Sequence, residues 1–172
     1  MRLLFAVNSQ GNINKKQADD FEQKSATIFG CRVERAQLTD MGAMLDLWRV
    51  TPGLGVGKGD DQDALKVFME RNPSTCLVLR IDEGLIGTVI GGFDGRRGYI
   101  YHLAVHPDYQ GKGYGQVLLN QVISELKSLG ALKIHLFVFN DNQPATGFYH
   151  HQGWELRHDI QVFSWDATRD HK

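Results

Sequence analysis

From Cys31 onward, apolar positions either alternate with polar ones or recur with helical spacing. Alternation predicts half-buried strands, and spacing of three to four residues predicts amphipathic helices. The predicted helices cover 41–48, 63–71, 113–129 and a short stretch through Ala145, Phe148 and Tyr149. The predicted strands cover 31–36, 75–81, 85–93, 99–105 and 134–139, with one or two more over 154–165. The order predicts an α+β fold, a mixed sheet with helices packed on it.

One strand–helix–strand unit is defined most clearly. Residues 99–105, 113–129 and 134–139 follow one another with short connections, and Gly130 stands where a helix C-cap is expected. Such a crossover makes its two strands parallel and its connection right-handed. The nearly all-apolar run 134–139 is typical of a buried parallel strand.

Composition and charge exclude several classes of function. The 172 residues carry a net charge of −1, so no overall basic field attracts nucleic acid or an anionic membrane. Two cysteines, Cys31 and Cys76, form neither a disulfide framework nor a metal-site spacing. No apolar run approaches membrane-spanning length, and the short apolar start does not read as a signal peptide. We therefore expect a cytoplasmic protein.

The stretch QGKGYG, Gln110 to Gly115, lies between a predicted strand and a predicted helix. A turn into a helix N-terminus presents unpaired N–H groups and the positive end of the helix dipole, which favours an anion. The spacing does not match a P-loop, because no Ser or Thr follows a Gly-Lys pair. It does not match a dinucleotide fingerprint either, because the glycine spacing differs and no acidic residue follows at a second strand end.

The surrounding residues resemble the GNAT superfamily of acyl-CoA-dependent N-acetyltransferases. The similarity rests on a strand end (Leu103, Val105, Pro107), the Q/RxxGxG/A signature (Gln110, Gly113, Gly115) and a downstream pattern (Asn142, Ala145, Phe148, Tyr149, Gly153, Trp154). It extends more loosely from Cys31 to Trp165, whereas residues 1–30 have no counterpart. The resemblance implies an N-terminal extension of uncertain structure, 1–30, and a GNAT domain, 31–172. It also implies a mostly antiparallel sheet with a central parallel strand pair.

The resemblance further implies how acetyl-CoA is bound as co-substrate. Backbone groups of the strand end pair with the pantetheine arm, and amides of the glycine-rich turn take the pyrophosphate. The implied contacts are Leu103, Ala104, Val105, Gln110, Gly111, Lys112, Gly113, Tyr114, Gly115, Gln116 and Asn142. For Asn142, a plain helix cap and a bond to the cofactor arm both remain open.

Two side chains are candidates for proton transfer. Tyr149 matches the family's tyrosine acid, which protonates the departing thiolate, although it could also simply pack its helix against the sheet. The strand 99–105 contains no acidic residue, so His102 is the nearest titratable candidate for the general base. A histidine in a strand is more often just a packed or exposed residue, and both interpretations stay open. No spacing of His106, His150 and His151 predicts a metal site.

The predicted reaction transfers an acetyl group from acetyl-CoA to a primary amine, of a small molecule or of a peptide or protein, by direct attack in a ternary complex. The acceptor pocket is expected between the first two helices and the Gly-rich loop 51–61, with Trp48 as a wall or as ordinary core. Asp60, Asp61 and Asp63 could attract the amine, yet the first two more simply cap a helix. The alternative function is a catalytically silent acyl-CoA-binding sensor or partner protein. The resemblance also implies a possible homodimer, because dimers are common in the family.

Overall fold

The computed structural model describes residues 30–168. The described residues form two compact units, one ending at Phe137 and one beginning at Val138, and each is described by itself. The predicted extension 1–30 lies outside the described residues except for its last position. In the described range, no helix is both long and apolar enough to cross a bilayer.

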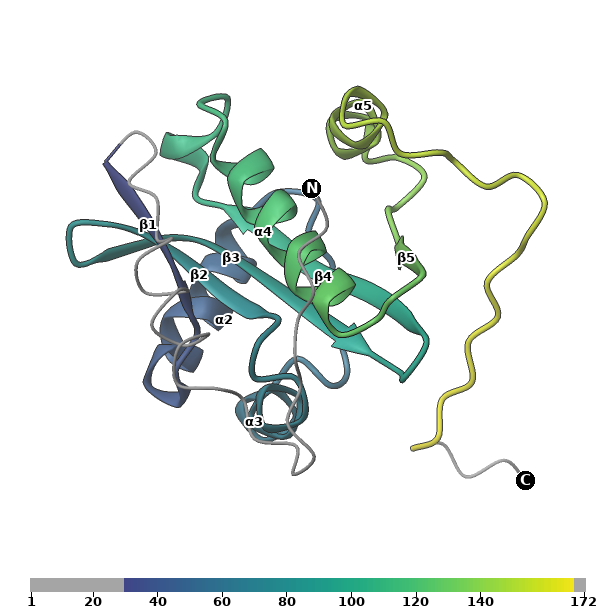
Figure 1. Ribbon diagram of the computed structural model, residues 1–172, viewed down its shortest axis with the longest axis horizontal. Helices are drawn as coiled ribbons and strands as arrows, with labels where there is room; N and C mark the ends of the chain where they lie inside the picture. The colour runs from purple at the N-terminus through teal and green to yellow at the C-terminus, as the bar shows by residue number, and fades with distance from the viewer. Residues whose placement is uncertain (1–29, 169–172) are drawn as a thin grey trace, which may run out of the picture. The chain divides into compact units, whose positions relative to one another are not determined.

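The first unit is built on a five-stranded sheet with the order β1-β2-β3-β4-β5 (Figure 1). The first four strands run antiparallel to their neighbours, and β5 runs parallel to β4. The strands are β1 (Cys31–Arg35), β2 (Cys76–Ile81), β3 (Gly84–Phe93), β4 (Arg97–Val105) and β5 (Lys133–Leu136). This arrangement confirms the predicted α+β class and the single parallel pair.

Helices cover both faces of this sheet, and β3 shows which helix covers which face. A side chain at Gly87 or Gly91 would collide with α4 (Tyr114–Ser128), whose Leu118 and Val122 approach within 2.9 Å of the added Cβ. The intervening residue Thr88 faces the other way and contacts α2 (Met41–Val50), while α3 (Gln62–Arg71) packs beside α2. Strand alternation thus places α4 on one face and the α2–α3 pair on the other.

Two short 3₁₀ turns precede helices, η1 (Leu38–Asp40) before α2 and η2 (Pro107–Tyr109) before α4. Asp40 does not cap α2 with its side chain. Asp40 stands at the N-cap of α2, but its carboxylate accepts from the Gln37 N–H at 2.9 Å and pairs with Arg80. The ion pair with a neighbouring strand replaces the local cap.

The predicted strand 134–139 forms, but it is shorter and less buried than expected. β5 ends at Leu136, and none of its residues is fully buried. Its ladder to β4 joins Arg97–Ile100 to Lys133–Leu136 and stops there, although β4 continues to Val105. β5 is the edge strand of the described sheet, so its apolar run is not enclosed by strands on both sides.

The second unit contains α5 (Gln143–His151), with Asn142 at its N-cap. The prediction of one or two strands over 154–165 is wrong, because this segment forms no ladder in the described part of the chain. Its large apolar side chains are exposed: Leu156, Ile160, Val162, Phe163 and Trp165. Alternating apolar residues specify the faces of a strand, but a strand also needs a hydrogen-bonded neighbour.

Candidate functional site

The centre of the site is an irregularity in β4. Thr88 of β3 pairs with Ala104 and Ile90 pairs with Tyr101, so β4 carries one extra residue between these pairs. His102 lies in the extra stretch with φ of +47°, a conformation that is uncommon without glycine. The bulge lets two consecutive side chains, those of Tyr101 and His102, face the α2–α3 side of the sheet.

Two side chains, those of Asp60 and Trp48, contact the imidazole of His102, and a third contacts its backbone. Its Nε2 lies 2.7 Å from Oδ1 of Asp60, and its ring stacks on Trp48 with centroids 4.2 Å apart. The Trp48 indole donates to Oγ1 of Thr88 at 2.8 Å, and Thr88 in turn contacts the His102 carbonyl oxygen at 3.4 Å. The side chains of His102 and Asp60 are only 13% and 20% exposed. The imidazole therefore has a fixed position and a fixed carboxylate partner.

Asp60 and Asp61 have different roles, although the sequence suggested helix capping for both. Asp61 caps α3, because its Oδ1 accepts from the Ala64 N–H at 2.8 Å. Asp60 is not a helix cap: its Oδ2 accepts from the Gly57 N–H at 2.7 Å, which fixes the loop, and its Oδ1 reaches His102. The loop 51–61 thereby delivers one carboxylate to β4.

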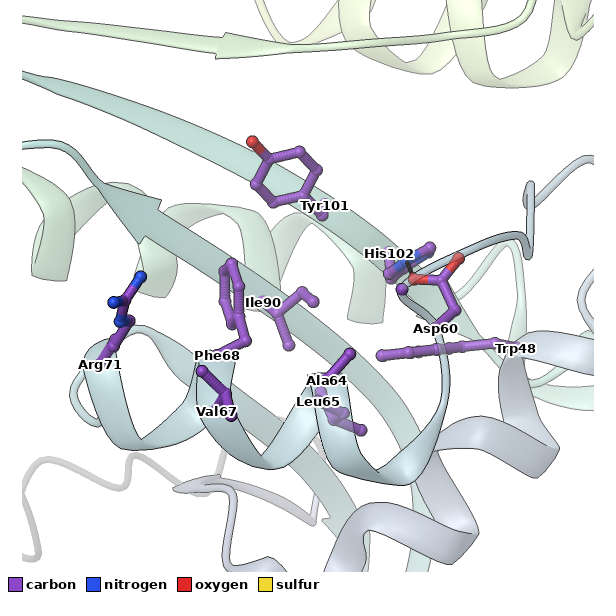
Figure 2. Close-up of a pocket in the computed structure, with 11 residues that line it drawn as sticks. Trp48, Asp60, Ala64, Leu65, Val67, Phe68, Arg71, Ile90, Tyr101 and His102 are labelled. Carbon is purple, nitrogen blue, oxygen red and sulfur yellow. Dashed lines mark hydrogen bonds and ion pairs between the residues drawn. The ribbon is translucent and has the colours of Figure 1, made fainter. Parts of the chain in front are cut away.

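A pocket of about 410 Å³ opens beside this pair (Figure 2). Figure 2 shows Asp60 and His102 at one end, Arg71 at the other, and Phe68 and Ile90 between them. The pocket residues are Trp48, Gly59, Asp60, Ala64, Leu65, Val67, Phe68, Arg71, Ile90, Tyr101 and His102. A pocket between the first two helices and the loop is thus present, and Trp48 is at once core and wall. From the loop 51–61, Gly59 and Asp60 line it.

The edge of β4 that faces away from β3 is open after the bulge. His106 N–H donates to the Ile86 carbonyl at 2.8 Å, so in antiparallel alternation Ala104 also faces β3. Leu103 and Val105 must then direct their backbone groups to the opposite side, where the β5 ladder has already ended. The Val105 carbonyl accepts from Gln110 Nε2 at 2.9 Å. In the described residues, no strand pairs with the remaining groups.

The glycine-rich turn continues directly from this edge. Gly111 and Gly113 have φ of +73° and +86°, and a Cβ at either position would meet no atom within 4 Å. Open space surrounds them, so backbone conformation rather than crowding requires glycine here. The first N–H to bond back into α4 is that of Gln116, to the Gly113 carbonyl at 3.1 Å. The N–H groups just before it come too early for an intrahelical partner.

Two other residues predicted to contact the cofactor, Lys112 and Tyr114, have contacts within the protein itself. The Lys112 ammonium donates to the Asp108 carbonyl at 2.9 Å and lies 5.3 Å from the centre of the Tyr109 ring. Tyr114 is buried at the start of α4, so only its backbone is presented to the turn. Lys112 still adds a positive charge close to the exposed amides.

Tyr149 and Asn142 belong to the second unit. Tyr149 lies between the rings of Phe148 and Trp154, with centroids 5.1 Å and 5.8 Å away, and burial raises the pKa of its phenol to about 12. The Asn142 side chain accepts from the Ala145 N–H at 3.1 Å, so the cap is formed. Its predicted bond to the cofactor arm stays a prediction, as does the acid role of Tyr149.

The other histidines considered in the sequence analysis are His106 in the first unit and His150 and His151 in the second. His106 faces Asp108 at 3.7 Å, and His150 and His151 are exposed at the end of α5. Among residues 30–168, no group of three or more His, Cys, Asp or Glu side chains is placed to hold a metal ion.

Sequence reasoning missed the pairing of Asp60 with His102 and the place of Arg71 in the pocket. The first joins residues 42 positions apart, and nothing in the local pattern of either segment announces it. The second had a readable signal, because Ala64, Phe68 and Arg71 recur at helical spacing and share one face of α3.

Comparison with known proteins agrees with this architecture. The model of the Acetyltransferase (GNAT) family matches residues 42–154. An acetyltransferase of Pectobacterium atrosepticum is 34% identical over 110 residues, which are 64% of this chain and 77% of that protein. An acetyltransferase of Yersinia enterocolitica is 29% identical over 126 residues, 73% of this chain and 89% of its own.

Solved structures share the fold at low identity. The PaiA N-acetyltransferase from Thermoplasma acidophilum in complex with coenzyme A has a TM-score of 0.67 and 19% identity, covering 74% of this chain and 91% of that chain. Ard1 from Thermoplasma volcanium also has a TM-score of 0.67, with 18% identity over 74% of this chain and 84% of its own. Since the family model spans well over half of the sequence, the chain belongs to the GNAT family of acetyltransferases.

Proposed function

We propose that the protein transfers an acetyl group from acetyl-CoA to a primary amine by direct attack in a ternary complex. The observation that carries the proposal is the bulge in β4. On its pocket side it presents His102, paired with Asp60. Immediately after it comes a backbone edge that no strand among residues 30–168 pairs with, and this edge leads to the open glycine turn. A proton acceptor and a binding edge for an extended amide-containing arm thus lie next to each other in the chain.

The described residues of the first unit fit acetyl-CoA. Leu103 and Val105 offer backbone groups to a pantetheine arm, as one strand does to another. The amides of the turn and of the first turn of α4 offer donors to a pyrophosphate, and the glycines leave room for close approach. When bound, acetyl-CoA supplies an acetyl group activated as a thioester. A strand-edge N–H would then donate to the oxygen that gains negative charge as the amine attacks.

His102 serves as the general base in this proposal. An alkyl ammonium has a pKa near 10, so a proton must leave before the nitrogen can attack. The imidazole accepts that proton, and the Asp60 carboxylate, 2.7 Å from Nε2, stabilises the imidazolium and holds the ring in place. Asp60 is therefore a positioning residue, and His102 the catalytic one.

Tyr149 serves as the acid that protonates the departing thiolate. Since burial raises its pKa to about 12, the phenol keeps its proton throughout the range in which such enzymes work. The same shift makes it a weak acid toward a thiol that titrates near 8.5, so transfer depends on close placement in the loaded enzyme.

The proposal is tested by release of coenzyme A thiol with a panel of primary amines. We expect turnover with at least one amine, and we expect Tyr149→Phe to lower kcat at least about 10-fold while the Kd for acetyl-CoA changes little. Tyr99→Phe, which removes a phenol from β4, is the matched control and should leave kcat near wild type. Tight acetyl-CoA binding without turnover on any amine would instead establish the silent sensor.

Other parts of the expectation stay predictions. They are the choice between a small-molecule and a peptide or protein amine, the cytoplasmic location, independence from nucleic acid and membrane, and the homodimer.

A further inference from the structure

The charged and apolar residues of the pocket beside His102 indicate which kind of acceptor amine it can bind, which the fold alone does not. We propose that it binds an amine whose other end is an anion, a carboxylate in the simplest case, with an apolar spacer between the two. The inference rests on the proposed function for the fate of the amine, but it also predicts binding as such.

The charged groups of the pocket lie at its two ends. Asp60, with His102, supplies negative charge at the end near the bulge, and Arg71 supplies positive charge at the other end (Figure 2). The residues between them are mostly apolar, with Leu65, Phe68 and Ile90 among them. A ligand with a cation at one end, an anion at the other and an apolar middle matches all three zones.

The helix backbone between the two ends gives a first length for that ligand. Ala64 lies on α3 beside the Asp60 end, and Arg71 follows seven positions later on the same helix. Seven positions along an α-helix are about 10 Å. This is close to the length of an extended chain of eight carbons, so an ω-aminooctanoate is a suitable first probe.

Arg71 is available for a ligand. Its neighbours on α3 pair with each other, Lys66 with Glu70 at 4.0 Å, and Arg71 has no acidic partner among residues 30–168. It is exposed at the pocket mouth, whereas the aromatic ring of Phe68 beside it packs edge-on against Tyr101 at 5.9 Å. An exposed guanidinium that lines one end of an apolar pocket suits a carboxylate, which it can bind through two parallel hydrogen bonds.

The same arrangement disfavours two other classes of amine. A long diamine would bring its second ammonium to Arg71, where like charges repel. A simple alkyl amine fills the apolar middle but leaves the guanidinium without a partner. The pocket therefore ranks zwitterionic acceptors first, neutral-tailed amines second and diamines last.

The test compares three chains of equal length, ω-aminooctanoate, octylamine and diaminooctane, at saturating acetyl-CoA. We expect kcat/KM for aminooctanoate to exceed that for octylamine by about 3- to 10-fold, the range of a partly exposed but well-oriented ion pair. In Arg71→Gln this ratio should fall to about 1, mainly through KM for aminooctanoate. Lys66→Gln, which removes a cation from the same helix outside the pocket, should keep the wild-type ratio.

Binding of aminooctanoate to the coenzyme A-loaded protein, followed by ligand-observed NMR, separates this inference from the proposed function. Turnover of amines with no preference for aminooctanoate, or with a preference that survives Arg71→Gln, overturns the inference and leaves acetyl transfer standing. Binding that depends on Arg71 without turnover of any amine supports the inference and overturns acetyl transfer. Neither binding nor turnover of aminooctanoate overturns the inference whatever the other amines do.

Discussion

Replacing Asp60 by asparagine isolates the charge that faces His102. The amide has nearly the shape of the carboxylate, so it can keep one hydrogen bond to the ring while it removes the negative charge 2.7 Å from Nε2. If His102 takes the proton of the amine, the imidazolium that forms in the transition state loses its partner. Acetyl-CoA binding, which we propose uses the open edge of β4, should not change.

The magnitude follows from the burial of the pair. A hydrogen bond to a charged group contributes about 1.5–3 kcal/mol. With side chains 13% and 20% exposed, the pair is too enclosed for solvent to screen most of this. Expressed as a rate, the loss corresponds to a fall in kcat of about 10- to 150-fold. The assay is kcat with the best amine of the panel, together with KM for acetyl-CoA and a thermal melt.

Asp61→Asn is the matched control, because it makes the same change of charge one residue away. Asn caps helices about as well as Asp, so the bond to the Ala64 N–H is retained and both stability and kcat should stay near wild type. The reasoning is refuted if Asp60→Asn keeps kcat within about 2-fold of wild type. It is equally refuted if the two variants lose the same amount, since a general field of the loop would then explain the effect.

Three further outcomes follow from the structure. Gly113→Ala forces alanine to φ of +86°, which costs about 1–2 kcal/mol, and should weaken acetyl-CoA binding in a titration. Gly42 lies in open space on α2, so Gly42→Ala should instead raise the free energy of unfolding by about 0.5–1 kcal/mol. Thr88→Val leaves the buried Trp48 indole N–H without its acceptor and should lower the free energy of unfolding in urea by about 1–3 kcal/mol; an unchanged midpoint would contradict this. Burial raises the pKa of the Cys76 thiol from 9.0 to about 12. Its contribution to stability is therefore complete below pH 9 and is lost as pH rises from about 9 to about 12. The melting temperatures of wild type and Cys76→Ala should converge in that window.

Most of the fold could be predicted because local patterns and global packing agree. The amphipathic stripe of α4 and the Gly130 cap define that helix in the sequence, and the structure places its buried residues Leu118, Val122 and Leu126 against the sheet. The segment 154–165 shows the opposite case. Its apolar residues describe what a strand there would look like, but no local signal says which neighbour would pair with it.

The candidate site divides in the same way. The glycine turn could be read from the sequence because its chemistry is local: a strand end, glycines with positive φ and a helix start follow one another without a gap. The pocket could not be predicted in this detail, since it depends on a loop carboxylate reaching a strand histidine 42 positions away. It also depends on a single inserted residue in β4, which alternation alone does not reveal.

That inserted residue makes β4 a strand with two phases. Before the bulge, the alternation of side chains is set by the packing of α4 and the α2–α3 pair; after it, the alternation decides which backbone groups turn toward the open edge. Deleting one residue between Tyr101 and Ala104 would preserve the register of only one of these two parts. Either the core would receive the wrong side chains, or the backbone groups of the open edge would turn toward β3. The number of residues in this strand is therefore constrained as strongly as their identity. We expect insertions and deletions to be tolerated at the hairpin between β3 and β4 and not at the bulge.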